Sequence, residues 1–199
     1  FVDLRDRPVL LVGGGEAAAR RARLLVRANA CLTVIARPPL HQQLSKLTSD
    51  APMEVIWRDF SPGDIGGRDL VFSATGVHEI DQYVAHAARA AEVPVNVVDR
   101  PDLSTFIMPS MIDRDPLTIA VSTGGAAPML ARLLRERFEK LLPAGLGGAI
   151  MVAEKQRAKV KQAVTSDASR RRLWEDFFEE VLADASASVD ENHLSERLL

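Results

Sequence analysis

Hydrophobic residues in the first half of the chain occur alternately in short continuous runs and in runs spaced at helical intervals. Continuous apolar runs of about four to eight residues are typical of strands buried on both faces, and the spaced runs are typical of amphipathic helices. The runs predict strands at residues 8–12, 31–36, 53–57, 69–75 and 94–98, and helices at 17–29, 40–48 and 78–91. This alternation predicts an α/β fold with a parallel sheet covered by helices.

The alternation ends after residue 99. Residues 106–109 and 117–121 are both strand-like with no helix between them, which predicts a strand pair appended to the parallel sheet. A helix is expected at 126–142, with Pro128 in its first turn, where proline is tolerated. The pattern from 146 to 183 is helical with a break near 166–167, and residues 186–199 are polar and weakly patterned.

A glycine-rich turn joins the first expected strand to the first expected helix. Gly13, Gly15 and Ala18 have the G-x-G-x-x-A spacing of a dinucleotide site, in which glycines allow a tight turn and the approach of a pyrophosphate. The helix N-terminus that follows carries a partial positive charge and free N–H groups, which suit a diphosphate. Such turns also occur for packing alone, but the strand before the turn and the helix after it favour a Rossmann-type site.

The residue after the second strand bears on the choice of dinucleotide. In Rossmann domains an acidic residue there holds the ribose hydroxyls of NAD, whereas an arginine accommodates the 2′-phosphate of NADP. Arg37, followed by Pro38, stands at this place. The motif alone therefore leaves the choice between NAD and NADP open.

Two strand ends supply candidate polar groups. Thr75 closes the fourth strand in a small polar segment suited to contact a cofactor. Asp99 closes the fifth strand, and open α/β sheets bind ligands beyond the carboxyl ends of their strands. A catalytic carboxylate and an ordinary solvated turn aspartate fit Asp99 equally well.

A second candidate site precedes the helix at 126–142. Ser122 and Thr123 fit helix caps and, with Gly124 and Gly125, also fit an anion cradle at a helix N-terminus. Arg132 belongs to a group of basic residues on that helix. These residues either form a solvent-exposed face or, if they face the crevice, attract a polycarboxylate ligand.

Composition excludes several classes of function. A net charge of −2 lacks the basic excess that bulk nucleic-acid binding requires. No apolar run approaches the ~18 residues of a membrane span and no signal peptide is evident, so a cytoplasmic location is expected. The four histidines lack metal-ligand spacing, and the single cysteine, Cys31, is expected to be a buried small residue.

Five segments together resemble the precorrin-2 dehydrogenase/sirohydrochlorin ferrochelatase module of siroheme synthases. They are residues 12–15, 96–99, 106–110, 113–114 and 121–128, and the resemblance covers residues 1 to about 174. It implies NAD-dependent oxidation of precorrin-2 to sirohydrochlorin, followed by Fe²⁺ insertion to give siroheme. It leaves open whether Fe²⁺ or Co²⁺ is the physiological metal, and whether a uroporphyrinogen-III methyltransferase domain is fused, as in many bacterial members.

The resemblance also implies roles for individual residues. NAD is expected at Gly13, Gly14, Gly15, Glu16, Ala17, Arg37, Pro38, Thr75 and Asn96. The tetrapyrrole is expected at Ser122, Thr123, Gly124, Gly125 and Arg132. Asp99 matches the aspartate implicated in both reactions, as general base and as a transient oxygen ligand for Fe²⁺. Similar proteins that use NAD also lack the acid after the second strand. Thr123 stands where some relatives have serine, and whether Thr123 is modified is open.

The expected organisation is a Rossmann domain at 1–112, a dimerisation region at 113–145 and a helical domain at 146–199. A homodimer is expected because one helix carries more apolar surface than so small a domain needs to cover alone; these residues are Met129, Leu130, Leu133, Leu134, Phe138 and Leu141. The rival interpretations are an NAD-binding sensor without turnover and an ordinary small-molecule dehydrogenase. The second is weakened because Tyr83 is followed by alanine, not lysine, at position 87.

Overall fold

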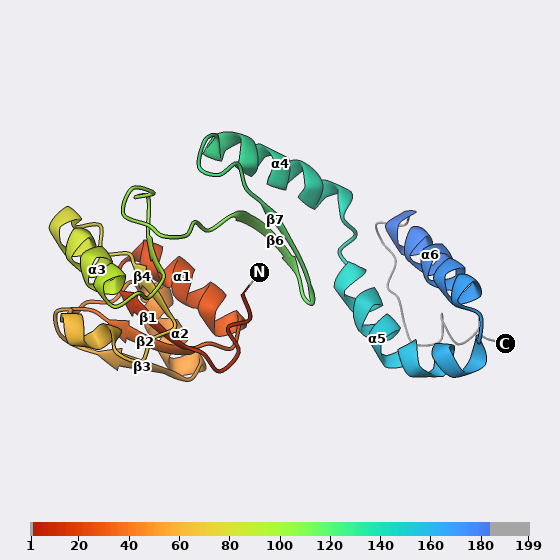
Figure 1. The fold of residues 1–199 in the computed structure, drawn as a ribbon, viewed down its shortest axis with the longest axis horizontal. Helices are drawn as coiled ribbons and strands as arrows, with labels where there is room; N and C mark the ends of the chain where they lie inside the picture. Colours follow the sequence, from red (N-terminus) through yellow and green to blue (C-terminus); the bar gives the residue numbers. More distant parts are fainter. Residues whose placement is uncertain (1, 184–199) are drawn as a thin grey trace. The chain divides into compact units, whose positions relative to one another are not determined.

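The computed structural model describes residues 2–183 of the chain (Figure 1). The chain forms two compact units, one up to Met108 and one from Pro109 onward, and each is described by itself. The polar segment expected at 186–199 lies outside the described residues. The expected three-part division stays a prediction.

The first unit is a parallel sheet with helices on both faces, which confirms the α/β class. The strands follow the order β3-β2-β1-β4-β5, so the order reverses between β1 and β4. The strands are β1 (Pro8–Val12), β2 (Cys31–Ile35), β3 (Met53–Ile56), β4 (Leu70–Ser73) and β5 (Val95–Val97). The helices are α1 (Glu16–Arg27), α2 (Gln42–Asp50), the short 3₁₀ helix η1 (Pro62–Ile65) and α3 (His78–Ala90).

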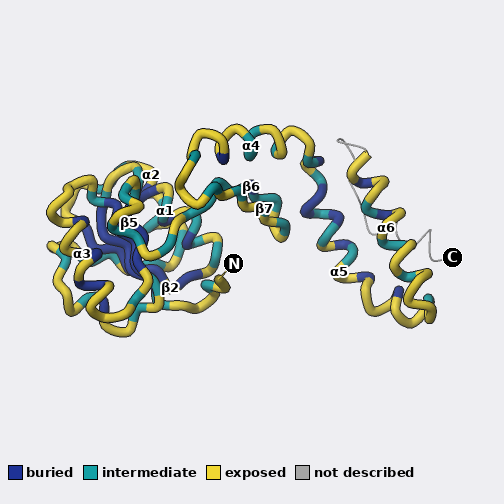
Figure 2. Tube along the Cα trace, turned by 45° about the horizontal axis from the view of Figure 1, so that its top comes forward, coloured by how far each residue is buried: buried dark blue, intermediate teal, exposed yellow. Residues whose placement is uncertain are grey.

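Two hydrophobic layers hold this unit together. Alternate residues of a strand point to opposite faces, so Val9 and Leu11 of β1 pack with α1 and α2, whereas Leu10 and Val12 pack with α3 and η1. Figure 2 shows the central strands as the most deeply buried part of the unit. Burial on both faces explains why β1 is a continuous apolar run rather than an alternating one.

Over its described residues, 109–183, the second unit consists of a hairpin and three helices. Strands β6 (Ser110–Arg114) and β7 (Leu117–Val121) form an antiparallel sheet of their own. The helices are α4 (Pro128–Leu141), α5 (Leu146–Ala163) and α6 (Asp167–Ala183). Helices α5 and α6 pack around Phe177 and Val181, and Trp174 and Phe178 lie against the same cluster. The predicted break between these helices is confirmed.

The strand pair differs from the prediction in position and pairing. It does not extend the parallel sheet, and its first strand begins at Ser110 rather than at residue 106. The preceding segment is held by β5 instead, because Thr105 N–H donates to the Val95 carbonyl at 2.8 Å and the Asn96 amide donates to the Phe106 carbonyl at 2.9 Å. Phe106 also packs edge-to-face on Phe72, so residues 105–106 line the sheet without forming a strand.

Two further expectations concern the burial of Cys31 and the absence of a membrane-spanning segment. Cys31 is exposed, so the expectation of burial is wrong; it is the first residue of β2, and burial begins at the next position. Among the described helices, none is long and apolar enough to cross a membrane. The cytoplasmic location stays a prediction.

Candidate functional site

The glycine turn lies where the strand order reverses, between β1 and β4. Gly13 has a φ of 127°, and a Cβ there would lie 2.4 Å from the Ala74 carbonyl oxygen. Only glycine fits such a contact between two backbone segments. The Gly13 N–H donates to the Ile35 carbonyl at 2.9 Å, so the turn is tied to β2 as well. Ligands of open α/β sheets bind in the crevice at this reversal.

Gly15 presents the opposite situation, because a Cβ there would meet no atom within 4 Å. It is the N-cap of α1, and among residues 2–183 no side chain caps this helix end. The first N–H groups of a helix lack partners within the helix. The unfilled space and the uncapped end of α1 fit the diphosphate of a dinucleotide.

The other three residues expected around this turn have distinct roles. The Gly14 carbonyl accepts from the His41 N–H at 2.8 Å, and a Cβ on Gly14 would approach Leu40 Cδ2 to 3.0 Å. Glu16 is exposed and pairs with Arg20 at 2.6 Å. Ala17 follows on the first turn of α1 and is half-buried. The turn is thus fixed by its own backbone rather than by Glu16.

Thr75 follows β4 and is held by a buried carboxylate that the sequence analysis missed. Asp81, on α3, accepts from the Thr75 hydroxyl at 2.7 Å and from the Ser73 hydroxyl at 2.6 Å. An acidic residue in the first turn of the helix after a Ser-x-Thr strand end is the signal that could have found it. Asp81 fixes the β4–α3 turn beside the glycine turn.

Arg37 and Pro38 follow β2 and are both exposed. The Arg37 guanidinium pairs with the carboxylate of Asp59, which lies in the loop after β3. The hydrogen bond and the charge of Asp59 raise the pKa of Arg37. Asp59 was not among the expected site residues, since it lies 22 positions from its partner.

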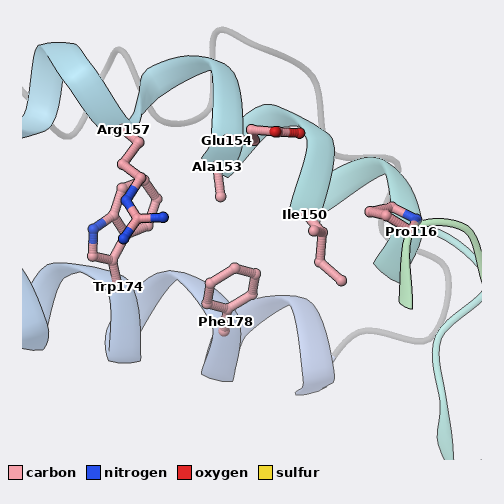
Figure 3. Close-up of a pocket in the computed structure, with 7 residues that line it drawn as sticks. All are labelled: Pro116, Ile150, Ala153, Glu154, Arg157, Trp174 and Phe178. Carbon is pink, nitrogen blue, oxygen red and sulfur yellow. The ribbon is translucent and has the colours of Figure 1, made fainter. Parts of the chain in front are cut away.

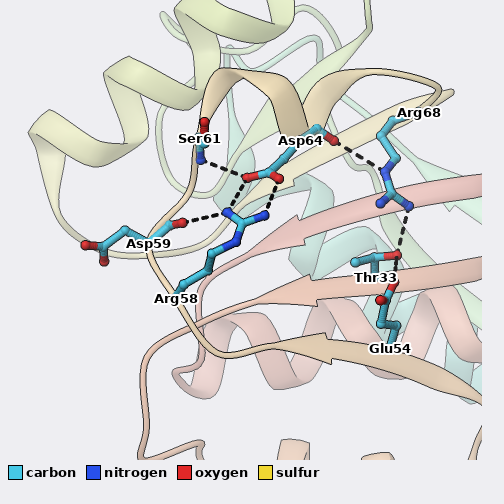
Figure 4. Close-up of polar contacts among 7 residues, drawn as sticks. All are labelled: Thr33, Glu54, Arg58, Asp59, Ser61, Asp64 and Arg68. Carbon is cyan, nitrogen blue, oxygen red and sulfur yellow. Dashed lines mark hydrogen bonds and ion pairs between the residues drawn. The ribbon is translucent and has the colours of Figure 1, made fainter.

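The loop that carries Asp59 is itself fixed by an ion pair (Figure 4). Arg58 donates to both carboxylate oxygens of Asp64, at 2.8 and 2.6 Å, and to the Asp59 carbonyl at 2.9 Å. The Ser61 N–H donates to Asp64 at 2.8 Å. The bond from Arg58 holds the pKa of the Asp64 carboxyl below its ordinary value. Figure 4 shows the Asp59 carboxylate pointing away from this pair.

Asp99 follows β5 in a tight turn closed by the Arg100 N–H and the Val97 carbonyl at 3.2 Å. Its φ of 59° is in the left-handed region, which aspartate visits more readily than most residues. Arg21 of α1 interacts electrostatically with Asp99; burial lowers the pKa of Arg21, and the Asp99 charge opposes that shift. Asp99 therefore lies at the carboxyl edge of the sheet within the electrostatic reach of a half-buried cation.

Two other groups lie near the end of β5. Arg100 contacts the His78 ring and pairs with Asp102 at 2.9 Å, and its bond lowers the pKa of Asp102. Asn96 lies within β5 and is buried, and its Oδ1 has no hydrogen-bond partner in the described structure. The Asn96 amide thus holds the segment after β5 through its hydrogen bond to the Phe106 carbonyl. Its contact with a cofactor stays a prediction.

The expected tetrapyrrole residues all belong to the second unit. Ser122 Oγ accepts from the Gly124 N–H at 3.2 Å, and Thr123 Oγ1 accepts from the Ala127 N–H at 3.1 Å. These hydroxyls organise the loop before α4, while the N-cap of α4, Ala127, offers no side-chain bond. Gly124 and Gly125 both have positive φ and open space around Cα.

Arg132 lies one turn further along α4 and pairs with Glu136 at 3.0 Å. The structure brings the glycine turn, Arg37, Pro38, Thr75 and Asp99 to one edge of the first unit, whereas Asn96 lies inside β5. The Ser122–Gly125 loop and Arg132 lie at the start of α4. Their assignment to one active site stays a prediction.

The second unit also contains an open pocket of about 500 Å³ between α5 and α6 (Figure 3). Trp174, Phe178 and Arg157 line it. No residue of this pocket was among the expected site residues. Among residues 2–183, no group of three or more His, Cys, Asp or Glu side chains is placed to hold a metal ion. Transient contact of Fe²⁺ with Asp99 stays a prediction.

Three family models match consecutive parts of the chain. A model described as putative NAD(P)-binding matches residues 1–110, and one described as sirohaem biosynthesis protein central matches 114–141. The third, described as sirohaem synthase dimerisation region, matches 146–199, which lies entirely after the region at 113–145 where we expected dimer contacts.

Curated relatives are siroheme synthases. The chain is 44% identical over 191 residues to the siroheme synthase of Methylobacillus flagellatus, covering 96% of the chain and 41% of that protein. It is 48% identical over 175 residues to siroheme synthase 3 of Aeromonas hydrophila, covering 88% and 37%. The chain thus spans about two fifths of the length of these relatives. A solved structure, "SirC, precorrin-2 dehydrogenase", matches the fold with a TM-score of 0.75 at 20% identity, covering 100% of this chain and 96% of that one.

Proposed function

The chain belongs to the putative NAD(P)-binding family, and from this membership together with its siroheme synthase relatives we propose that it is an NAD-dependent precorrin-2 dehydrogenase that also inserts Fe²⁺ into sirohydrochlorin. The observation that carries the proposal is the uncapped N-terminus of α1, with open space at Gly15, at the same sheet edge as Asp99. The siroheme synthase relatives supply the substrate class.

The cofactor is proposed to bind at the β1–α1 turn. The N–H groups of the first turn of α1 face its diphosphate, and Gly13 and Gly15 leave room for that group. Thr75, fixed by Asp81, closes the neighbouring strand end. When bound, NAD⁺ supplies the hydride acceptor of the oxidation.

Asp99 is proposed to act as general base in both reactions. Oxidation of precorrin-2 removes a hydride and a proton, and metal insertion displaces two pyrrole protons, so each reaction requires a proton acceptor. Arg21 of α1, a half-buried cation, interacts electrostatically with Asp99. The carboxylate is also a hard oxygen donor that Fe²⁺ can contact during transfer.

The second unit is proposed to bind the tetrapyrrole and to form the dimer interface. The Ser122–Gly125 loop precedes the start of α4, whose Met129 and Leu130 N–H groups follow Pro128 and can donate to substrate carboxylates. Arg132 adds a positive charge on the same helix. Helix α4 exposes several apolar side chains, and a homodimer would bury them. The dimerisation-region match at 146–199 lies outside α4 and supports a homodimer without naming the α4 face.

The function is tested by mixing the protein with precorrin-2 and NAD⁺ under anaerobic conditions and following the absorbance. We expect NADH and sirohydrochlorin to appear in equal amounts, and subsequent addition of Fe²⁺ to convert sirohydrochlorin to siroheme faster than in a protein-free control. NAD⁺ binding without NADH formation would contradict the proposal and favour a sensor without turnover.

A further inference from the structure

Arg37 stands where an arginine generally indicates NADP, yet the proposed cofactor is NAD. We propose that Asp59 determines the preference for NAD over NADP. Its carboxylate forms an ion pair with Arg37 and also serves as the hydrogen-bond acceptor for the ribose hydroxyls. This inference rests on the proposed function and names a residue outside the glycine motif.

The sheet topology brings the two residues together. Strands β2 and β3 are parallel neighbours, with Ile35 opposite Ile56, so the segments after them leave the sheet at the same edge. Arg37 lies two residues beyond the end of β2, and Asp59 lies three beyond the end of β3. Their guanidinium and carboxylate groups are directly paired.

The loop after β3 keeps Asp59 available for this pairing. Its neighbour Arg58 is already engaged by both oxygens of Asp64 and binds only the carbonyl of Asp59. The Asp59 carboxylate therefore points out of the loop (Figure 4). The acid that usually follows β2 in NAD-binding domains is in this way supplied by the adjacent strand.

The pair does little for the stability of the fold. The Arg37 and Asp59 side chains are 74% and 63% exposed, and ion pairs this exposed contribute little to the free energy of unfolding. The pair has a larger effect on which dinucleotide binds. A 2′-phosphate would meet an arginine that is already neutralised and a carboxylate that repels it, whereas a 2′-hydroxyl can donate a hydrogen bond to that carboxylate.

Titration calorimetry of the full chain with NAD⁺ and with NADP⁺ tests the inference without any turnover. Asp59→Asn releases Arg37 and removes the repulsion, so we expect NADP⁺ to bind about tenfold more tightly, because one charge interaction near a surface is of that order. NAD⁺ should bind more weakly. The double variant Asp59→Asn with Arg37→Ala should lose most of the gain for NADP⁺.

The matched control is Asp69→Asn, which breaks a similarly exposed pair, with Arg7, at the opposite edge of the sheet. It should leave the ratio of the two affinities unchanged. An unchanged ratio in Asp59→Asn would overturn the inference while leaving the proposed function intact. An equal gain for NADP⁺ in the double variant would overturn the role of Arg37. Binding of neither dinucleotide to the unmodified protein would remove the proposed function itself.

Discussion

At the residue scale, Gly13 and Gly15 show two different reasons for a glycine in one turn. Gly13 is required by the protein itself, because any side chain would collide with the backbone at Ala74. Gly15 is not required by any protein atom, so the space beside it is available to a ligand. A substitution at Gly15 therefore separates ligand binding from folding.

Gly15→Val is expected to retain the fold and to weaken NAD⁺ binding by more than tenfold, a loss of more than about 1.4 kcal/mol, since its side chain would occupy the diphosphate space. Titration calorimetry measures the affinity, and Gly63→Val, at another glycine with open surroundings, is the matched control. Unchanged affinity in folded Gly15→Val would place the dinucleotide elsewhere.

Some of these residues could be predicted from the sequence, and others could not. The glycine turn and Asp99 are readable because each follows directly from a strand pattern and a short motif. Asp59 and Arg21 are not, because each acts through a partner that only the folded sheet brings near. Asp81 was missed although its partners, Ser73 and Thr75, are close to it in the sequence. Cys31 was misplaced because the apolar run containing it is buried only from its second residue.

At the element scale, the sequence predicts the α-helices and the parallel strands to within two residues, since continuous buried runs and helical spacing are strong patterns; the short 3₁₀ helix η1 was not predicted. The first hairpin strand is the exception. Residues 106–109 resemble a strand because they are mostly apolar. In the structure, however, the Phe106 ring packs on Phe72 of the sheet, and this segment forms no strand. Hydrophobicity alone does not distinguish a strand from a segment that packs against one.

The start of α5 depends on a glycine in close contact with the hairpin. A Cβ on Gly147 would lie 2.2 Å from the Arg114 carbonyl oxygen, whereas one on Gly148 would meet nothing within 4 Å. Gly147→Ala is therefore expected to lower the free energy of unfolding by about 1–3 kcal/mol. Gly148→Ala should raise it by about 0.5–1 kcal/mol, because alanine is the better helix former. Equal effects of the two changes in urea unfolding would contradict this packing.

The loop after β3 should give a pH-dependent contribution to stability. Because Arg58 lowers the pKa of folded Asp64, the contribution is fully present above the unfolded pKa of about 4 and is lost as the pH falls through the lower, folded pKa. Asp64→Asn is expected to cost about 1–2 kcal/mol at pH 7 and progressively less below pH 4.

Urea unfolding of both proteins at pH 7 and pH 3 measures this difference. Asp50→Asn, at an exposed site on α2, is the control and should change the stability by less than about 0.5 kcal/mol. A deficit of Asp64→Asn that stays the same at pH 3 would show that the shape of the side chain matters and its charge does not.

At the scale of the whole molecule, the outer face of α4 predicts assembly. Met129 and Leu141 are 64% and 73% exposed, and Leu130, Leu133 and Phe138 are exposed as well. Monomeric proteins rarely leave several large apolar side chains of one helix this exposed to water unless a partner covers them. We therefore expect a homodimer that uses this face.

Leu133→Asp should shift the protein toward the monomer, because a symmetric interface would bury the new charge twice. Sedimentation velocity at micromolar concentration measures the mass. Val2→Asp, at an exposed apolar residue of the first unit, is the control and should remain dimeric. A monomeric mass of the unmodified protein would contradict the prediction.

The proposed bifunctional enzyme depends on Asp99 more than on any other residue. Asp99→Asn should preserve the left-handed turn, since asparagine adopts this conformation as readily as aspartate, and should therefore preserve the fold and the affinity for NAD⁺. It removes a base expected to be worth roughly 10²–10⁴ in each rate.

The most direct measurement is a paired assay on one preparation of Asp99→Asn: sirohydrochlorin formation from precorrin-2 with NAD⁺, and Fe²⁺ insertion into supplied sirohydrochlorin. We expect both rates to fall together by roughly 10²-fold or more while NAD⁺ binding is retained. Loss of oxidation with normal metal insertion would contradict a shared base, and normal rates in both reactions would remove Asp99 from the chemistry.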